Sequence, residues 1–345
     1  MFRLLIGICF ATPALAVSPP EISVDLKSEM ILVFQNTDGG WPKNVAWEQF
    51  NTLTDAVEWF QSNRKRKSTI DKSATYVQIH DLAKAYDKTN NPAYRDAARR
   101  GLEFLLREQR PSGGWRGSDV DAITFNDNAM VGVMQLLKEI TNKKNDCDWI
   151  EPATLKRCQQ ALTKAVRVVL DCQIVVGGKK TAWCQQHDHK SLKPVKARTY
   201  ELASISGGES VKIVRYLMGI EQPNSEIVTA IESAVAWFRK SAIHGVRIER
   251  FEIDPVKEGS KVIKQDVRMV RDPAAKPVWA RFYEVETNLP FFCNRDGIKV
   301  YSLAEVRLER RTGYSWYGDA PAKLLETDYP MWHKSLQKNE RNVPK

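Results

Sequence analysis

One pattern occurs three times in this chain: Gln35 precedes Gly39-Gly40-Trp41, Gln109 precedes Gly113-Gly114-Trp115, and Gln173 precedes Gly177-Gly178, with Trp183 shortly after. The intervals of 74 and 64 residues each leave room for two helices and their loops. Each Gly pair is expected to end the helix before it, because glycine tolerates the left-handed conformation found at helix C-termini. The chain is therefore predicted to contain about three helical-hairpin repeats.

Amphipathic periodicity predicts helices on both sides of these loops. Apolar residues recur at three- and four-residue spacing in residues 30–34, 102–106 and 165–170. Helices with polar starts are predicted at residues 74–86, 128–140 and 209–218, and further amphipathic helices at residues 93–109, 155–173 and 225–241. Similar hairpins repeated in one direction close readily into a ring, so the predicted fold is mainly α, an α/α toroid with irregular loops and a few short strands. An irregular lobe with short β-like runs at residues 261–264 and 265–270 is expected from about residue 245.

The composition is that of a globular domain. The chain has 345 residues, of which 43% are hydrophobic and 27% charged, and its mean hydropathy is −0.42. No apolar run approaches the roughly 20 residues of a membrane helix. Lys and Arg number 52 against 42 Asp and Glu, a net charge of +10. This surplus favours a polyanionic partner such as nucleic acid, anionic lipid or an acidic polysaccharide.

Residues 1–16 are interpreted as a secretory signal peptide. Arg3 precedes an apolar run, and the small-residue segment Ala14-Leu15-Ala16 follows. Cys9 follows Ile8, where a lipoprotein site requires a small residue, so no membrane anchor is predicted. Residues 17–345 are then expected to form a single catalytic domain that is secreted or periplasmic. Export makes nucleic acid a poor candidate partner, and a monomer is expected.

Five cysteines follow the leader, and no pair has the CxxC spacing of a zinc site: Cys147, Cys158, Cys172, Cys184 and Cys293. An odd number leaves at least one thiol free. Buried thiols and one or two disulfides remain equal alternatives.

Acidic residues stand at the start of the helices that follow the Gly-Gly loops: Asp71, Asp127 and Glu209. Such a residue commonly caps the free N–H groups of a helix and complements its dipole. Three carboxylates at equivalent positions of a ring would instead converge on one mouth, where hard oxygen ligands suit Ca²⁺. Both interpretations stay open at this point.

Cationic residues gather in two later segments. Lys196 and Arg198 lie just ahead of Gly207-Gly208, whereas Arg281 and Arg295 lie near Trp, Tyr and Phe residues. Arginines beside aromatic rings suit bidentate contact with carboxylates next to sugar-stacking faces, and structural ion pairs are the alternative. The run His187-Asp188-His189 is interpreted as a solvated loop.

Seven short motifs follow one another along the chain: Gly39-Gly40-Trp41-Pro42-Lys43-Asn44, Thr69-Ile70-Asp71, Asn126-Asp127-Asn128-Ala129-Met130, Trp183-Cys184-Gln185-Gln186, Lys196-Ala197-Arg198-Thr199-Tyr200-Glu201, Ser206-Gly207-Gly208-Glu209-Ser210 and Trp279-Ala280-Arg281-Phe282-Tyr283. In this order and combination the chain resembles the pectate lyases of polysaccharide lyase family 10. That family has a toroid of three α/α units, which matches the repeat number counted above.

The resemblance implies a pectate lyase that cleaves the α-1,4 linkage of polygalacturonate by calcium-assisted β-elimination, giving 4,5-unsaturated oligogalacturonides. The implied roles are calcium ligand for Asp71 and Asp127, catalytic base for Arg198, and substrate binding for Arg281, Arg295, Lys43 and Lys196. An arginine base requires an environment that destabilises its charged form, because arginine ordinarily has a pKa above about 12.

One position departs from the family pattern. After the aspartate that matches Asp71, the family usually places Asn and Gly, whereas this chain has Lys72-Ser73. The Asn is expected to help hold the calcium, and an ammonium group repels a cation. Three outcomes are open: Lys72 turns away and calcium binds with fewer ligands, its charge replaces part of the calcium's role, or the activity and substrate are altered.

Two other classes of function remain as alternatives. An α/α-toroid glycoside hydrolase acting on oligouronides would need an acid and a base carboxylate about 6.5–9.5 Å apart if it inverts configuration. Asp71 with Asp127 could supply such a pair. The other alternative is a non-catalytic binding protein for an acidic glycan.

Overall fold

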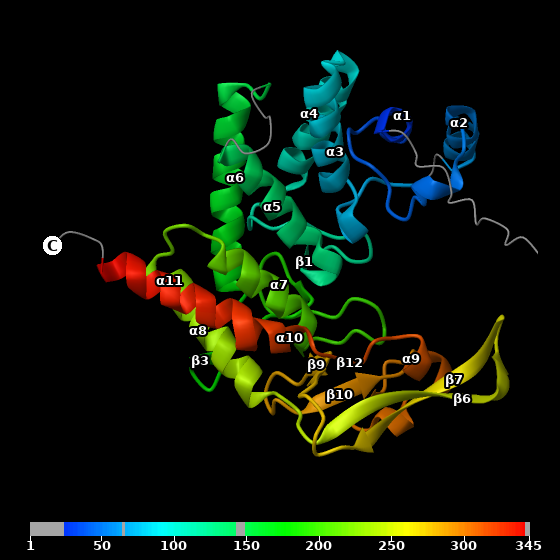
Figure 1. The fold of residues 1–345 in the computed structure, drawn as a ribbon, viewed down its shortest axis with the longest axis vertical. Coiled ribbons are helices and arrows are strands. Elements are labelled where there is room, and N and C mark those ends of the chain that lie inside the picture. The colour runs from blue at the N-terminus through cyan, green and yellow to red at the C-terminus, as the bar shows by residue number, and fades with distance from the viewer. Residues whose placement is uncertain (1–23, 64–65, 143–148, 342–345) are drawn as a thin grey trace, which may run out of the picture.

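The computed structural model describes residues 24–63, 66–142 and 149–341 (Figure 1). The predicted signal peptide and Cys147 lie outside the described residues. The helices occupy Val24–Val33 (α1), Leu53–Ser62 (α2), Tyr76–Thr89 (α3), Pro92–Glu108 (α4), Ala129–Thr141 (α5), Pro152–Asp171 (α6), Gly207–Met218 (α7), Ser225–Lys240 (α8), Leu308–Thr312 (α9), Ala320–Lys323 (α10) and Tyr329–Arg341 (α11). The mainly α class is confirmed, and the amphipathic predictions agree with α3 to α8 within a few residues.

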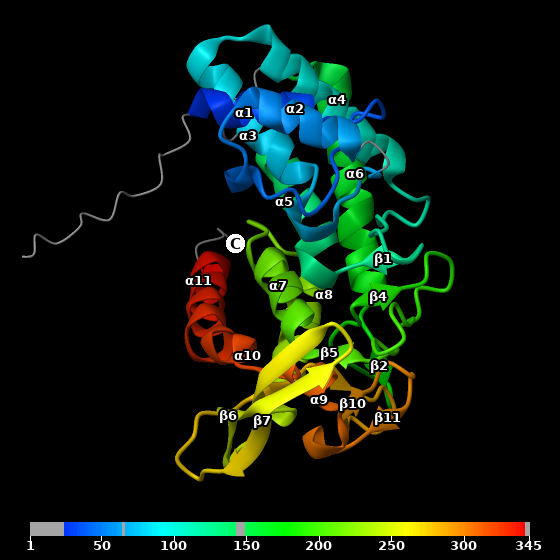
Figure 2. The same cartoon turned by 90° about the vertical axis from the view of Figure 1, so that its right-hand side faces the viewer.

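The helices pack as successive antiparallel pairs. The pairs α3 with α4, α5 with α6 and α7 with α8 are the three predicted hairpins. One row of contacts joins α1, α3, α5, α7 and α10, and a second row joins α4, α6 and α8. Figures 1 and 2 show these rows continuing from the N-terminal helices at the top toward the lobe below α7. The loops before α3, α5 and α7 therefore lie at corresponding ends of neighbouring pairs.

Each repeat is joined to the next by a glutamine side chain. The Nε2 atoms of Gln35, Gln109 and Gln173 donate to the backbone oxygens of Ala97, Ala161 and Ala230 in the next outer helix, at 2.8 Å in each case. The same Nε2 atoms also donate to a carbonyl in their own loop, of Gly39, Gly113 and Thr181 respectively. The third of these carbonyls belongs to Thr181, so Gly177-Gly178 is not the structural counterpart of the first two Gly pairs.

The glycines of the first two repeats are required by close packing. A Cβ on Gly39 would lie 2.4 Å from the Arg100 carbonyl oxygen, and one on Gly113 would lie 2.5 Å from that of Lys164. Both have a positive φ, of 93° and 97°. Each follows its helix by about five residues and lies in a turn, so the prediction that the Gly pair itself ends the helix was wrong. Gly177 instead lies in the turn between β2 (Val175–Val176) and β3 (Lys179–Lys180), with open space around it.

A buried tryptophan marks every repeat. The indoles of Trp41, Trp115 and Trp183 donate to backbone oxygens of the preceding helices, of Ile31, Leu105 and Val169, at 2.7 Å each. Trp279 repeats the contact with Phe238 at the end of α8, at 2.8 Å. The pattern thus extends to a fourth position that the sequence spacing did not reveal, because 96 residues separate Trp183 from Trp279.

The expectation of an irregular lobe from about residue 245 holds only in part, because the chain ends in α10 and the long helix α11, and α10 contacts α7. Between α8 and α10 the chain forms a β-rich lobe. Its longest feature is a hairpin of Val246–Glu258 (β6) and Lys261–Arg271 (β7). The predicted short runs at 261–270 belong to β7, but β6 was not predicted. Its apolar residues alternate over residues 246–248 and 251–253, and Glu249-Arg250 interrupts this alternation. The remaining strands are Ile123–Thr124 (β1), Gln186–His187 (β4), Ile205–Ser206 (β5), Trp279–Ala280 (β8), Phe282–Tyr283 (β9), Pro290–Cys293 (β10), Lys299–Val300 (β11) and Tyr317–Gly318 (β12). A sheet in the order β11-β10-β9-β5 joins this lobe to the third repeat.

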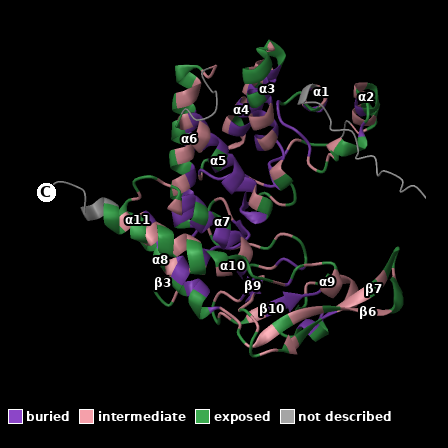
Figure 3. Ribbon diagram, viewed as in Figure 1, coloured by how far each residue is buried: buried purple, intermediate pink, exposed green. Residues whose placement is uncertain are grey.

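Two apolar clusters hold the chain together. The larger runs through the helix pairs and includes the buried tryptophans, while the smaller fills the lobe around Phe282, Phe291 and Trp316. Figure 3 shows the buried residues concentrated along α5, α7 and the strands beneath them. The four described cysteines are buried, and no disulfide joins any two of them: Cys158, Cys172, Cys184 and Cys293. No helix among the described residues is long and apolar enough to span a membrane.

Candidate active site

The first two repeats carry matching turns ahead of their inner helices. Short 3₁₀ turns at Asp71–Ser73 and Asn126–Asn128 each contain two residues with a positive φ. These are Lys72 (47°) and Ser73 (66°) in the first turn, and Asp127 (50°) and Asn128 (62°) in the second. The backbone N–H groups of Thr69 and Thr124 donate to the carbonyl oxygens of Trp41 and Trp115. These equivalent bonds show which residues of the first turn correspond to which residues of the second. Lys72 is thus the counterpart of Asp127. Asp71 corresponds to Asn126, so the expectation that Asp71 and Asp127 occupy equivalent positions was wrong.

The equivalent positions share their environment. Asp71 and Asn126 are buried, whereas Lys72 and Asp127 are exposed. The Tyr76 hydroxyl contacts the Ser73 Oγ at 3.1 Å and the Asn128 carbonyl at 3.4 Å, and so joins the two turns. The exposed cation of one turn therefore lies beside a turn that presents an exposed anion.

Hydrogen-bond donors surround Asp71. Its Oδ2 accepts the Ser118 backbone N–H at 2.6 Å, the Ser118 hydroxyl and the Lys43 ammonium at 3.2 Å. Lys43 also contacts the Ser118 hydroxyl and the Asp119 Oδ1, the latter at 3.4 Å. A Cβ on Gly117 would lie 2.6 Å from the Asp71 Oδ1, so glycine is needed for this close approach.

The third repeat places a carboxylate differently. Helix α7 begins directly after Ser206, without a left-handed turn, and Glu209 lies buried in its first turn. Glu209 accepts hydrogen bonds from the Ser206 hydroxyl, from Gln185 Nε2 at 2.8 Å and from Arg281 Nη2 at 3.1 Å. Gln185 and Arg281 also reach the Asn126 Oδ1, each at 3.4 Å. This network ties the second repeat to the third and to the lobe.

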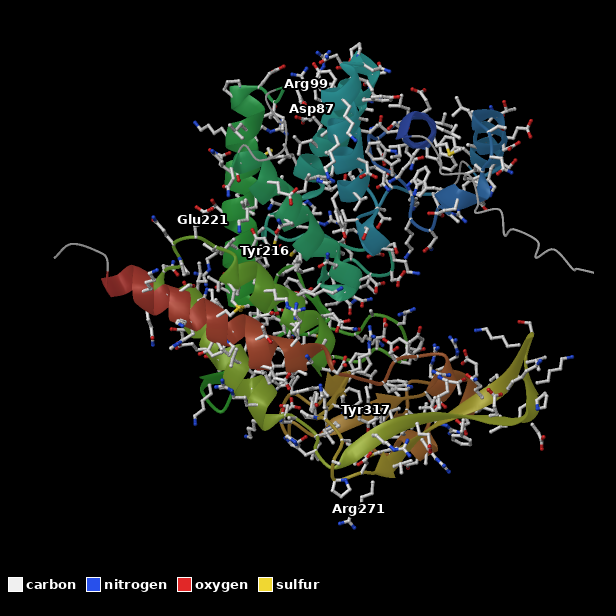
Figure 4. All side chains as sticks on the ribbon, in the orientation of Figure 1. Asp87, Arg99, Tyr216, Glu221, Arg271 and Tyr317 are labelled. Carbon is white, nitrogen blue, oxygen red and sulfur yellow. The ribbon has the colours of Figure 1, made fainter. Side chains whose placement is uncertain are left out.

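Arg281 is the deepest of the predicted substrate-binding cations. Its guanidinium lies 4.5 Å from the centre of the Tyr314 ring, and its side chain is 21% exposed. Burial alone would lower the pKa of Arg281, but Glu209 and the other nearby acidic groups raise it. Tyr317, labelled in Figure 4, comes from the lobe and lines a cavity of about 130 Å³ together with Glu209 and Arg281.

Arg198 is held by Glu201. Its Nε donates to the Glu201 Oε2 at 2.8 Å and its Nη2 donates to the Oε1, an arrangement that leaves Nη1 without a partner among the described residues. The Tyr314 hydroxyl donates to the same carboxylate at 2.7 Å. Hydrogen bonding to Glu201 raises the pKa of Arg198 further above its ordinary value. Burial alone would raise the pKa of Glu201, but the bonds from Arg198 and Tyr314 lower it.

Asp119 lies between Lys43 and Arg198 in electrostatic terms. Burial alone would raise the pKa of this carboxyl, but the charges of Lys43 and Arg198 and a hydrogen bond from Ser118 lower it. Asp119 therefore lies within electrostatic range of both cations. The structure brings together Lys43, Asp71 and Arg198 on one side and Asn126 and Arg281 on the other.

The remaining predicted cations lie at the periphery. Arg295 makes a bidentate pair with Glu309 at 2.8 and 2.9 Å and lies 5.5 Å from the centre of the Tyr200 ring. Its side chain is 55% exposed. Lys196 is exposed and makes no ion pair with a described residue. A ligand carboxylate would therefore meet Lys196 directly but would compete with Glu309 for Arg295.

His187 is structural, and its interpretation as part of a solvated loop was wrong. The ring is fully buried in β4, where Nε2 accepts the Cys184 N–H at 3.0 Å and Nδ1 contacts the Leu192 carbonyl at 2.8 Å. Burial lowers the pKa of His187 to about 4. The neighbouring Asp188 and His189 are half-buried.

Several residues of the site were not singled out from the sequence. Ser118, Asp119 and Tyr314 lie in loops with no repeated pattern, so the sequence offered no signal for them. Asn126, Gln185 and Glu201 lie inside the motifs quoted above, and those motifs could have identified them. Among the described residues, no three His, Cys, Asp or Glu side chains form a group that could hold a metal ion.

The comparisons with known proteins agree with one another. The profile of the pectic acid lyase family matches residues 35–325. A family 10 polysaccharide lyase from Cellvibrio cellulosa is 31% identical, with a TM-score of 0.74, and the match covers 90% of this chain and 92% of that one. An aspartate-to-alanine mutant of a family 10 polysaccharide lyase from the same organism, in complex with trigalacturonic acid, is 30% identical, with a TM-score of 0.74 over 90% and 93% of the two chains. No curated protein sequence matches the chain. The chain belongs to the pectic acid lyase family, and it is a polysaccharide lyase.

Proposed function

We propose that this pectate lyase cleaves polygalacturonate by β-elimination at the site that joins Lys43, Asp127, Arg198 and Arg281. The observation that carries the proposal is the geometry of Arg198, whose Nε and Nη2 are fixed by Glu201, while Nη1 has no partner in the described part of the chain. A neighbour of the same family was solved with trigalacturonic acid, which supports an acidic polysaccharide as the substrate. The helix pairs are proposed to form an open α/α toroid within a single catalytic domain, and the protein is proposed to be exported.

Arg198 is the proposed base. It takes the proton from C5 of a uronate, the C5–H electron pair forms the C4–C5 double bond, and the C4–O bond breaks. The leaving oxygen gains a proton from solvent, so the products are one saturated chain end and one unsaturated uronate. The Glu201 pair keeps the guanidinium oriented but also favours its protonated form, so the reaction is expected to speed up with rising pH.

Asp127 fits a calcium site better than Asp71 does. Asp127 is exposed and makes no ion pair with a described residue, and hard carboxylate oxygens suit Ca²⁺. The Asp71 Oδ2 already contacts an ammonium, a hydroxyl and a backbone N–H. Asp127 would therefore hold calcium together with substrate carboxylates. A bound Ca²⁺ would withdraw charge from the uronate carboxylate and acidify the C5 proton.

Lys72 adds positive charge next to this proposed site. It stands in the first repeat where the second has Asp127, and the two turns are joined through Tyr76. Its ammonium can neutralise a uronate carboxylate, which is part of what a divalent ion would do. Lys43, Arg281, Arg295 and Lys196 are proposed to meet further carboxylates of the polymer.

The hydrolase alternative is disfavoured by the surroundings of Asp71. Each group that contacts its Oδ2 is a hydrogen-bond donor, so the position suits an ionised acceptor and not a proton-donating acid. A hydrolase would also release no unsaturated sugar.

The first experiment is to incubate the purified protein with polygalacturonate at alkaline pH, with and without EDTA, and to follow the ultraviolet absorbance of unsaturated uronate. A rise abolished by EDTA and restored by Ca²⁺ is expected. A rise that EDTA does not affect would argue against calcium and for Lys72. Absence of a rise in both samples would refute the elimination mechanism.

A further inference from the structure

A second cavity opens next to the proposed site on the side of Asp71. It has a volume of about 530 Å³ and is lined by residues 42–44, 66–70 and 115–118, with Phe104 and Glu108. Lys43, Gly117 and Ser118 line it and also contact or adjoin Asp71. This volume lies within the roughly 300–1,000 Å³ typical of small-ligand sites.

The cavity lining carries more positive than negative charge. Among the described residues, Arg66, Lys67 and Arg116 form no ion pair with a carboxylate. The one acidic residue in the lining is Glu108, whose Oε1 lies 3.5 Å from Arg107 Nε. Three unpaired cations around one hollow make it attractive to an anionic ligand.

Two of these cations are held in place by contacts other than ion pairs. Arg66 Nη1 donates to the Asn44 carbonyl at 3.2 Å, and its guanidinium lies 4.8 Å from the centre of the Trp59 ring. Arg116 Nε donates to the Gly117 carbonyl at 3.0 Å. Their remaining N–H groups are free to donate to a ligand, in the forked geometry that suits carboxylates.

We propose that this cavity is a distal subsite that binds further uronate residues of the same polysaccharide chain. The inference rests on the proposed function, because it requires a substrate that already passes Asp71 and Lys43. Continuity with the site through Lys43 and Ser118 allows one polymer to occupy both places. Its carboxylates meet Arg66, Lys67 and Arg116, so long substrates bind more tightly than short ones.

The test compares substrate lengths in a charge-removing variant. The double variant Lys67→Gln/Arg116→Gln is assayed on a galacturonate trimer and a hexamer, at low and high salt. Loss of two exposed charge contacts is expected to lower kcat/KM for the hexamer about tenfold at low salt and less at high salt. The value for the trimer is expected to stay within about twofold. Lys67→Arg/Arg116→Lys, which keeps both charges, is expected to keep most of the hexamer preference.

The matched control is Lys84→Gln/Lys88→Gln, which removes two exposed cations of α3 outside the cavity lining. It is expected to leave both substrates within about twofold. Equal losses for trimer and hexamer, or a control that loses as much as the cavity variant, would overturn the subsite. Hexamer activity unchanged in the double variant would overturn it as well. Failure of the proposed function is recognised separately, because the wild-type protein would then release no unsaturated uronate from either substrate.

Discussion

Replacing Glu201 with glutamine is expected to shift the pH dependence of the lyase toward lower pH. The substitution keeps the size of the side chain but removes the negative charge that Arg198 contacts through Nε and Nη2. If Arg198 is the base, kcat/KM rises with pH as its guanidinium loses a proton. Removing Glu201 lowers the pKa of Arg198, so the same activity is reached at a lower pH.

The size of the shift follows from the geometry of the pair. Opposite charges 2.8 Å apart attract by about 1.5 kcal/mol at the dielectric constant of water, and more in a less polar medium. The Arg198 side chain is 44% exposed, so the water-like value applies best. About 1.4 kcal/mol corresponds to one pKa unit, and the expected displacement is therefore about one to two pH units.

The assay records kcat/KM for polygalacturonate from neutral pH to the alkaline limit of protein stability. Tyr314→Phe is the matched control, because it removes the other donor to Glu201 but leaves the carboxylate and the ring beneath Arg281. Its profile is expected to keep the wild-type pH dependence. A Glu201→Gln profile that falls in height without moving along the pH axis would refute Arg198 as the titrating base. It would leave the guanidinium only the role of orienting substrate.

Three further outcomes are expected. Lys72→Asn should tighten Ca²⁺ binding, measured by calorimetry on the substrate-free protein, and should make activity more sensitive to EDTA. An unchanged Ca²⁺ affinity would show that Lys72 faces away from the ion. Gly132→Ala should lower the free energy of unfolding, measured in urea, by about 1–3 kcal/mol, because a Cβ there would lie 2.2 Å from the Tyr76 ring. The control Gly208→Ala, where a Cβ meets open space, should change the free energy of unfolding much less. His187 is buried, and burial lowers its pKa to about 4, so on acidification the unfolded state takes up the proton before the folded state does. The free energy of unfolding should therefore decline by about 3 kcal/mol in total as pH falls from about 6.5 to about 4. A His187→Gln variant that shows the same decline would contradict that assignment.

The sequence predicted the helices well because each inner and outer helix buries one face. Helices α2 and α11 were not predicted, although α2 packs on α1. The third Gly pair was wrongly assigned to the repeat. It has the same spacing from Gln173 as the first two pairs have from their glutamines, but Gln173 donates to the Thr181 carbonyl instead. In the hairpin, the runs of β7 were predicted, whereas β6 was missed because Glu249-Arg250 interrupts its alternation. Local sequence patterns report burial, and α2 and the β6–β7 hairpin bury few of their residues.

The candidate site was predicted residue by residue but not as a network. Asp71, Arg198 and Arg281 were identified, whereas their partners Ser118, Glu201 and Glu209 define what each can do. Ser118 lies 47 residues from Asp71, and Glu209 lies 72 residues from Arg281, and pairing across such distances leaves no periodic signal. Glu201 lies three residues after Arg198 in the same motif, so that pair could have been identified. The difference between Asp71 and Asp127 likewise required backbone conformation, since only the left-handed residues Lys72 and Asp127 reveal the true alignment of the turns.

The ion pairs that the substrate-binding cations make with protein carboxylates also constrain how the enzyme can recognise a polymer. Arg281, Lys43, Arg198 and Arg295 each contact a protein carboxylate, and the exposed fractions of these side chains rise in that order from 21% to 27%, 44% and 55%. A single uronate must therefore compete with a carboxylate already in place, and its net gain at any one cation is small. Several uronates on one chain add these small gains without repeating the entropic penalty of association. Strong dependence of affinity on substrate length is thus expected even before the unpaired cations Lys67 and Arg116 are counted.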